Sequence, residues 1–208
     1  MNEFERDPKF WKDVGLKAEL EFHKKNKWRQ SQAFYDDSLK LFMKFGLDAN
    51  SFRGKTIIDA GCGSKFRTQV FSNASIIGID PLAEGFSKFI PWSDLYTAKE
   101  LYSVALEDHV ESLDESSDAV ICINVIDHGY QSSEQIVNMY RYLKHRGRLY
   151  LAVDLEREVP DTKHNSMSGE TVKKYVQQAG FVIEMSKEDN ETFDRQAKKR
   201  LLLVGTML

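Results

Sequence analysis

A run of β-branched residues that opens directly into a glycine-rich turn constrains the fold of this chain more than any other feature. Ile57-Ile58-Asp59-Ala60 has the composition of a buried strand, and Gly61-Cys62-Gly63 follows it at once. Glycines in such a turn admit backbone conformations and close contacts that a side chain forbids. The N-terminus of a following helix would offer backbone amides to a carboxylate or phosphate. The segment therefore predicts the first strand of an α/β domain and a ligand-binding turn.

Short apolar runs alternate with amphipathic stretches from Gly54 to the end of the sequence. The clearest helices are residues 132–143, with apolar side chains on one face, and residues 168–178, which end at Ala179-Gly180. Strands that alternate with helices imply a largely parallel sheet with right-handed crossovers. We expect strands at residues 55–60, 75–79, 101–106, 119–123, 148–153, 181–185 and 201–207.

The residues before Gly54 have a different character, because charged residues are mixed with aromatic ones at roughly helical spacing. Two or three amphipathic helices are expected there. A chain of 208 residues is long enough for one buried core and short for two independent domains. We therefore divide the chain into an N-terminal helical extension, residues 1–53, and an α/β domain, residues 54–208.

Charge and hydropathy argue against nucleic acid and membrane partners. The chain has 29 Lys and Arg against 32 Asp and Glu, so no overall positive field attracts RNA, DNA or an anionic membrane. Residues 1–10 are charged and lack the apolar core of a signal peptide, and no apolar run is long enough to span a bilayer. Cys62 and Cys122 lie in apolar stretches, which suits buried, reduced thiols better than a disulfide. We expect a cytoplasmic protein without a bound metal.

An acidic residue ends the second apolar run, in Ile79-Asp80-Pro81, 21 residues after Asp59. At the carboxyl end of a strand, the two oxygens of Asp80 suit the paired hydroxyls of a ribose. The alternative is a plain turn residue before Pro81. A dinucleotide is disfavoured, because Gly61-x-Gly63-x-x-Phe66 lacks the last glycine of the dinucleotide fingerprint.

Five segments, taken in chain order, resemble the class I S-adenosylmethionine-dependent methyltransferases. They are residues 59–63, Asp80, residues 106–108, residues 118–128 and residues 142–151. In that family the first is the glycine-rich motif, Asp80 corresponds to the acidic ribose ligand, and residues 106–108 lie where the adenine is usually contacted. Residues 118–128 resemble the segment that ends near the methyl donor, and residues 142–151 resemble the passage from a helix into the fifth strand. The resemblance covers the whole α/β domain.

The resemblance implies a Rossmann-like fold with a seven-stranded, mostly parallel sheet, helices on both faces and the last-inserted strand antiparallel. It also implies S-adenosylmethionine as the cofactor. The residues that it places at the cofactor are Asp59, Gly61, Cys62, Gly63, Asp80, Pro81, Leu106, Glu107 and Asn124. Two departures, Lys65 in place of a glycine and His145-Arg146 in place of Pro-Gly, indicate an atypical cofactor loop and an atypical turn before the fifth strand. Lys65 and Arg67 are either contacts of the methionyl carboxylate or solvated cations.

Methyl transfer from a sulfonium needs chiefly orientation and the exclusion of water. A hydroxyl or amine acceptor also needs a base, for which His128 and Asp127 are our first candidates, since they follow the fourth strand. Asp154 and His164 are further candidates for the same role. The alternative is that His128 packs near the cofactor without moving a proton.

The acceptor is expected to be small and polar. Related methyltransferases that act on base or amide nitrogen often carry Asn or Asp followed by Pro-Pro and an aromatic residue, where this chain has Asn124-Val125-Ile126-Asp127. We therefore expect methylation of a small molecule, at oxygen ahead of nitrogen. The aromatic and basic residues Trp28, Arg29, Phe34 and Tyr35 either form a lid over the acceptor or pack in the core.

Two other functions stay open at this point. An RNA or protein methyltransferase would need a local basic groove, for which Lys24, Lys25, Lys27 and Arg29 are available. Such a run is more often a solvated helix face. A protein that binds S-adenosylmethionine without catalysis would keep the same motifs.

Overall fold

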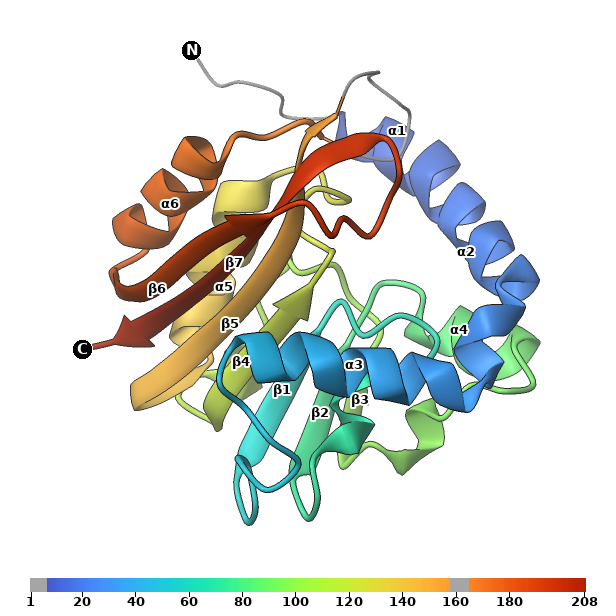
Figure 1. Ribbon diagram of the computed structural model, residues 1–208. Helices are drawn as coiled ribbons and strands as arrows, with labels where there is room; N and C mark the ends of the chain where they lie inside the picture. Colours follow the sequence, from blue (N-terminus) through green and yellow to red (C-terminus); the bar gives the residue numbers. More distant parts are fainter. Residues whose placement is uncertain (1–6, 158–164) are drawn as a thin grey trace.

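The seven predicted strands all form, and they lie in one sheet in the order β3-β2-β1-β4-β5-β7-β6 (Figure 1). The computed structural model describes residues 7–157 and 165–208. Strand β7 runs antiparallel to β5 and to β6, and the other pairings are parallel. The strands are β1 (Thr56–Ala60), β2 (Ser75–Ile79), β3 (Glu100–Tyr102), β4 (Ser117–Ile123), β5 (Leu143–Arg157), β6 (Phe181–Asp189) and β7 (Ala197–Met207).

The third and fifth strands differ most from their predicted bounds. Strand β3 ends at Tyr102 because its partner β2 ends at Ile79, which lies opposite Tyr102. No strand continues alongside, and the chain turns so that the Asp108 N–H donates to the Ala105 carbonyl (3.0 Å). Strand β5 is longer than predicted because it pairs with β7 over its whole second half, out to Arg157.

The turn that precedes the main part of β5 is irregular, as the sequence departure there indicates. Ser117 of β4 lies opposite Leu143, whereas Ala119 lies opposite Arg148, so β5 carries extra residues in this stretch. Arg146 takes a φ of 63°, a left-handed conformation in which glycine is ordinarily favoured.

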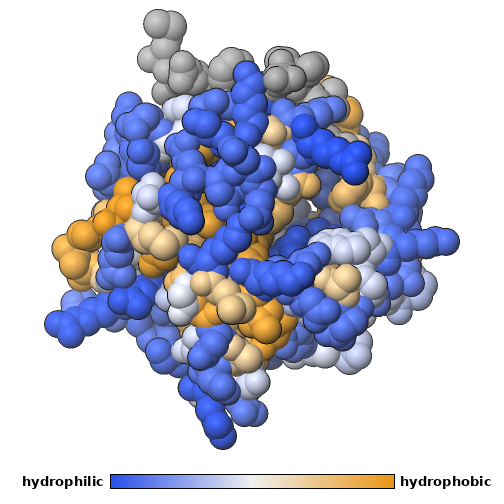
Figure 2. Space-filling model, in the orientation of Figure 1, coloured by the Kyte–Doolittle hydropathy of each residue, from blue (hydrophilic) through white to orange (hydrophobic). Residues whose placement is uncertain are grey.

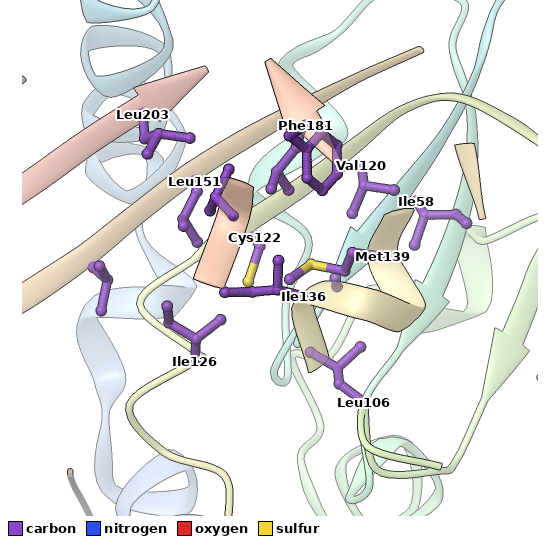
Figure 3. Packing of buried hydrophobic residues seen from close by; sticks show 14 of the residues in the cluster. Ile58, Leu106, Val120, Cys122, Ile126, Ile136, Met139, Leu151, Phe181 and Leu203 are labelled. Atoms are coloured by element: carbon purple, nitrogen blue, oxygen red, sulfur yellow. The ribbon is translucent and has the colours of Figure 1, made fainter. Parts of the chain in front are cut away.

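Successive residues of the central strands point to opposite faces of the sheet and build two apolar layers. On one face Ile58, Val120 and Leu151 pack against Ile136 and Met139 of α5 (Figure 3). On the other face, Ile57 and Ile121 pack beneath helices α3 and α4. The longer helices are α2 (Leu16–Lys25), α3 (Gln32–Lys44), α4 (Ala83–Phe89), α5 (Ser132–Arg141) and α6 (Gly169–Gln178).

The N-terminal helices divide into two groups by what they cover. Helix α3 crosses the front of the sheet in Figure 1, and its Phe34 and Phe42 side chains are fully buried. The preceding elements, η1 (Trp11–Gly15), α2 and η2 (Lys27–Gln30), lie along the ends of the strands and line a cavity. Phe34 of α3 therefore packs in the core, although α3 also lines the cavity with Asp37, Lys40, Leu41 and Lys44. A lid role for α2 and η2 stays a proposal, as does the division at residue 54.

The surface that carries α3 is largely hydrophilic, with hydrophobic side chains gathered in patches near its centre (Figure 2). None of the helices in the described ranges combines the length and the apolar character that crossing a bilayer requires.

Candidate active site

A cavity of about 1030 Å³ lies where the carboxyl ends of β1, β2 and β4 meet the N-terminal helices. This is the edge at which open α/β sheets bind nucleotides. Cavities for one small ligand measure roughly 300–1,000 Å³, so there is room here for a cofactor and a second small molecule. Its walls come from the turn after β1, the segments after β2 and β4, helices η1, α2, η2 and α3, and residues 191–196 between β6 and β7.

The glycine-rich turn after β1 requires its glycines. Gly61 and Gly63 line the cavity and have φ values of 71° and 64°. A Cβ atom on Gly61 would lie 2.4 Å from the Val125 side chain, and one on Gly63 would lie 2.9 Å from Cε1 of His23. The helix expected after the turn is only the 3₁₀ segment η3 (Arg67–Val70), after which Phe71 enters the core in an extended conformation. The atypical cofactor loop is thus observed.

Asp80 sits at the edge of the cavity, with Pro81 beside it. Its carboxylate accepts hydrogen bonds from the backbone N–H groups of Gly63 and Leu82, both at 2.9 Å. Burial raises the pKa of Asp80 to about 6. Each carboxylate oxygen has a further lone pair, so the two oxygens can also accept two hydroxyl groups. Asp80 therefore has the turn role, and its carboxylate is also suitably placed for the proposed ribose contact.

Asp59 and Cys62 support the turn from beneath. Thr68 donates its hydroxyl to Asp59 Oδ2 (2.7 Å), and burial raises the pKa of Asp59 to about 6. The Cys62 thiol is also buried, and burial raises its pKa well above the usual value. Neither side chain lines the cavity, so their predicted part in cofactor binding would be to shape the turn.

The two residues predicted at the adenine point in different directions. Leu106 lines the cavity, whereas Glu107 holds the loop that follows β4. Glu107 Oε1 accepts hydrogen bonds from the Tyr130 N–H (2.7 Å) and from Gln135 Nε2 (2.8 Å). The second carboxylate oxygen, Oε2, is buried without a hydrogen-bond partner.

Asn124 and His128 follow β4 and both line the cavity. Asn124 has a φ of 58°, a conformation that Asn tolerates better than most other side chains. Its Oδ1 is buried and has no hydrogen-bond partner among the described residues. Its Nδ2 lies 3.4 Å from Nε2 of His128. The His128 ring also has Glu19 Oε2 at 3.9 Å from Nδ1 and Asp127 Oδ1 at 3.8 Å from Nε2. Trp11 fixes the loop by donating Nε1–H to the His128 carbonyl (2.7 Å).

The other candidate bases are placed away from the cavity or beyond the described residues. Asp127 is fully buried and its Oδ2 lies 3.4 Å from the Arg157 guanidinium. Asp154 accepts the N–H groups of Phe193 and Asp194, at 3.0 and 2.8 Å, and so shapes the loop between β6 and β7. His164 lies outside the described residues. Of the three candidates within the described residues, His128 is the one that lines the cavity.

The main site residue that sequence reasoning missed is His23 of α2, which is buried against the glycine-rich turn. Ser64 approaches His23 Nδ1 with its hydroxyl (2.7 Å) and with its N–H (3.3 Å), so Nδ1 is the acceptor. Nε2–H then donates to Glu19 Oε1 (3.1 Å). Burial lowers the pKa of His23 to about 4, which keeps the ring neutral. No local motif marks His23 as a site residue, because its partner in the glycine-rich turn, Ser64, is 41 residues away.

Four arginines line this cavity, Arg29, Arg67, Arg195 and Arg200, and one of them, Arg67, was predicted as a contact of the methionyl carboxylate. Arg29 of η2 reaches the turn, since a Cβ on Gly63 would lie 3.4 Å from its Nη1. Arg67 lines the cavity beside the Phe34 ring, with Cζ 4.9 Å from the ring centroid. Lys65 is buried with Nζ 4.6 Å from the centre of the Tyr35 ring and does not line the cavity. The alternative of two solvated cations therefore describes neither side chain.

These residues fit S-adenosylmethionine. A nucleoside needs a carboxylate at the end of the second strand, an apolar adenine wall and a turn without side chains, and Asp80, Leu106 and the two glycines supply them. The methionyl end carries a carboxylate and an ammonium group, for which Arg29 and the unpartnered Oδ1 of Asn124 are suitable partners. Over the described ranges, no three His, Cys, Asp or Glu side chains gather as metal ligands would.

Comparisons with known proteins agree with this fit. A family model described as a methyltransferase domain matches residues 51–197. The bovine (Bos taurus) mitochondrial ubiquinone biosynthesis O-methyltransferase is 28% identical over 151 residues, which are 69% of this chain and 39% of that protein. A tRNA U34 carboxymethyltransferase from Sulfurovum sp. is 25% identical over 133 residues, 62% of this chain and 44% of that protein. The chain thus spans about two fifths of the length of these relatives.

Solved structures share the fold. The Burkholderia thailandensis 1,6-didemethyltoxoflavin-N1-methyltransferase, with 1,6-didemethyltoxoflavin and S-adenosylhomocysteine bound, superposes with a TM-score of 0.66 at 12% identity, covering 97% of this chain and 91% of that one. A methyltransferase from Aquifex aeolicus gives 0.61 at 15% identity, covering 98% and 100%. Because the family model matches well over half of the chain, the protein belongs to the methyltransferase-domain family. It has the class I fold and S-adenosylmethionine as its cofactor.

Proposed function

We propose that this protein transfers the methyl group of S-adenosylmethionine to an oxygen of a small polar acceptor. The observation that carries the proposal is that His128 lines the same cavity as Asp80 and the glycine-rich turn. The candidate base and the candidate cofactor residues would then share one space, which lies between the carboxyl ends of the strands and the N-terminal helices. The volume of about 1030 Å³ suits two small molecules, whereas a folded RNA or protein needs an open groove.

The chain's own residues have three tasks in this reaction. When bound, the cofactor supplies a methyl group already activated by its sulfonium, so catalysis rests mainly on orientation and on exclusion of water. Asp80 would hold the ribose hydroxyls, and Arg29 the methionyl carboxylate. His128 would take the acceptor proton. The carboxylates of Glu19 and Asp127, each within 4 Å of its ring, would stabilise the imidazolium so formed.

Oxygen is favoured as the methylated atom by the curated relatives whose names state O-methyltransferase. The relative named as acting on tRNA supports the rival of an RNA acceptor. The contacts made by the basic residues of α2 and η2 argue against an RNA acceptor. Lys24 pairs with Glu21 (2.7 Å) and lies over the Phe89 ring, and Arg29 turns inward to the cavity. The run thus presents no continuous basic groove.

Two further parts of the proposal concern the extension and the location. We propose that η1, α2 and η2 act as a lid over the acceptor, since they form one wall of the cavity and His23 ties α2 to the glycine-rich turn. Cys62 and Cys122 are free, buried thiols, which is the form expected in a reducing compartment and supports the cytoplasm as the location.

A screen of fractionated cell extract tests the acceptor class. Purified protein is incubated with S-adenosylmethionine radiolabelled in the methyl group and with metabolite, RNA and protein fractions, each with and without nuclease or protease. Label in the small-metabolite fraction that resists both enzymes is the expected result. Label that depends on intact RNA or intact protein, or the absence of transfer to any fraction, contradicts the proposal.

A further inference from the structure

The described cations around the cavity differ in whether they have a carboxylate partner. Lys44 and Arg200 are held by Asp189, at 3.0 and 2.8 Å, and Lys40 is held by Asp37 at 3.1 Å. By contrast, no carboxylate of the described residues lies within 4.0 Å of the guanidinium of Arg29 or of Arg67. Arg29 and Arg67 thus face one cavity without a direct ion pair to any described carboxylate, although Glu19, Asp37 and Asp80 line the same cavity at longer range.

The guanidiniums of Arg29 and Arg67 both lie near one aromatic ring. Cζ of Arg29 lies 5.4 Å from the centroid of Phe34, and Cζ of Arg67 lies 4.9 Å from the same centroid. Burial lowers the pKa of Arg67 to about 9, and the like charge of Arg29 lowers it as well. Arg67 is thus held close to a like charge in a partly desolvated place, and the charges of Asp59 and Asp37 only partly offset this effect. A bound anion would stabilise the guanidinium further.

Arg29 and Arg67 face different parts of the cavity. Arg29 is the one that reaches the glycine-rich turn, next to Gly63. Arg67 instead has the Phe193 ring at 5.8 Å and the Trp28 ring at 6.0 Å, so it lies between η2 and the loop that joins β6 to β7. Its one hydrogen bond among the described residues, from Nη1 to Ser38 Oγ (3.2 Å), uses one of five guanidinium N–H groups.

The surroundings of Arg67 also suit a flat ligand. Phe193 lies near two cations, since Cζ of Arg200 in strand β7 is 5.1 Å from its centroid and Cζ of Arg67 is 5.8 Å from it. The Phe193 loop is itself fixed, because Asp154 accepts the backbone N–H groups of residues 193 and 194. The aromatic wall and the arginine are therefore both in place before a ligand arrives.

We infer that the methyl acceptor carries an anionic group, a carboxylate or a phosphate, which Arg67 binds beside the aromatic side chains of Phe34 and Phe193. This inference rests on the proposed function above and names the acceptor class for that same site. Arg67 binds the acceptor and takes no part in moving the methyl group. A planar guanidinium offers two parallel N–H donors to either anion, so the geometry of the contact is the same for both.

The test measures binding of matched probes to protein saturated with S-adenosylhomocysteine, by isothermal titration calorimetry. Benzoate and phenyl phosphate are compared with benzamide, which has the same planar shape as benzoate without its charge, and acetate is compared with acetamide. At least one anion is expected to bind about tenfold or more tightly than its neutral partner. A preference for phenyl phosphate over benzoate would assign the anion as a phosphate, and the reverse preference as a carboxylate.

Variants of Arg67 test whether this residue causes the tighter binding of the anionic probe. Arg67→Gln should abolish it while S-adenosylhomocysteine affinity stays within about threefold, and Arg67→Lys should retain part of it because the charge remains. Arg53→Gln, at an exposed position outside the cavity, is the matched control and should change neither. The comparison of anion with amide in the unmodified protein needs no variant, so the test stands even if Arg67→Gln fails to fold.

Three results would overturn the inference. The first is that no anion binds more tightly than its neutral partner. The second is that the anion binds the free protein but not the protein loaded with S-adenosylhomocysteine, which would place it at the cofactor carboxylate. The third is that Arg67→Gln weakens S-adenosylhomocysteine binding tenfold and leaves the anion preference intact. Methyl transfer without any anion preference would contradict this inference alone, whereas an anion preference without methyl transfer would contradict the proposed function.

Discussion

Substitutions at two glycines test whether α2 is packed tightly against the glycine-rich turn. Both glycines have a left-handed backbone conformation, but only one of them lies against α2. Gly63 has a φ of 64°, and a Cβ there would lie 2.9 Å from His23 Cε1. Gly54 has a φ of 71°, and a Cβ there would meet nothing within 4 Å. Gly63→Ala therefore adds strain and a collision, whereas Gly54→Ala adds strain alone.

The expected losses of stability follow from these contacts. An alanine in the left-handed region costs about 1–2 kcal/mol, and this applies to both variants. In Gly63→Ala the His23 ring must also move, which weakens its hydrogen bonds to Ser64 and Glu19 by about 1 kcal/mol each. The free energy of unfolding should fall by about 1–2 kcal/mol for Gly54→Ala and by about 3–4 kcal/mol for Gly63→Ala.

Urea unfolding and calorimetric titration with S-adenosylhomocysteine check both parts. Gly63→Ala should weaken cofactor binding about tenfold or more, and Gly54→Ala should leave it unchanged. In a His23→Ala background the collision is gone, so Gly63→Ala should then cost only the backbone term. Equal losses of stability and of affinity for the two glycine variants would refute the idea that α2 is pressed onto this turn.

Three further changes test single residues and the lid. The affinity for S-adenosylhomocysteine should fall as the pH drops through about 6, because Asp80 then takes up a proton and loses the charge that accepts the ribose hydroxyls. Asp80→Asn should bind about 1.5–3 kcal/mol less favourably and should not show this pH dependence. If calorimetry finds the same pH dependence in Asp80→Asn, the ribose role is wrong. His128→Asn should lower the single-turnover rate about 10²–10⁴-fold at unchanged cofactor affinity. Asp127→Asn should instead destabilise the fold by about 2 kcal/mol, because it leaves buried Arg157 less well paired. A loss of rate in Asp127→Asn with little change in His128→Asn would make Asp127 the base. Deleting residues 1–30, which spares α3, should reduce turnover more than cofactor affinity, and full activity of the shortened protein would contradict the lid.

The sequence predicted best what depends on short stretches of chain. The strands around Ile57 and Ile121 follow from β-branched runs, and Gly61, Gly63 and Asp80 from their positions at strand ends. The helix after the glycine-rich turn was overestimated, because a run from Ser64 to Val70 does not reveal that Phe71 is required in the core.

The direction of side chains in loops was harder to predict. Glu107 and Asp127 stand beside residues that line the cavity, yet their carboxylates bind the loop after β4 and Arg157. His23 and Arg29 meet the glycine-rich turn only when α2 and η2 fold back across the strand ends. Such contacts join residues more than 30 positions apart and leave no local pattern.

The measurement that tests the central claim most directly identifies the atom that receives the methyl group. S-adenosylmethionine labelled with ¹³C in its methyl group is incubated with the protein and the active metabolite fraction, and the product is examined by NMR, where methyl carbons on oxygen and on nitrogen resonate in separate regions. We predict a single labelled methyl group bonded to oxygen on a small molecule that carries a carboxylate or a phosphate. A labelled methyl group on nitrogen, or one that appears only in RNA or protein, would contradict the account.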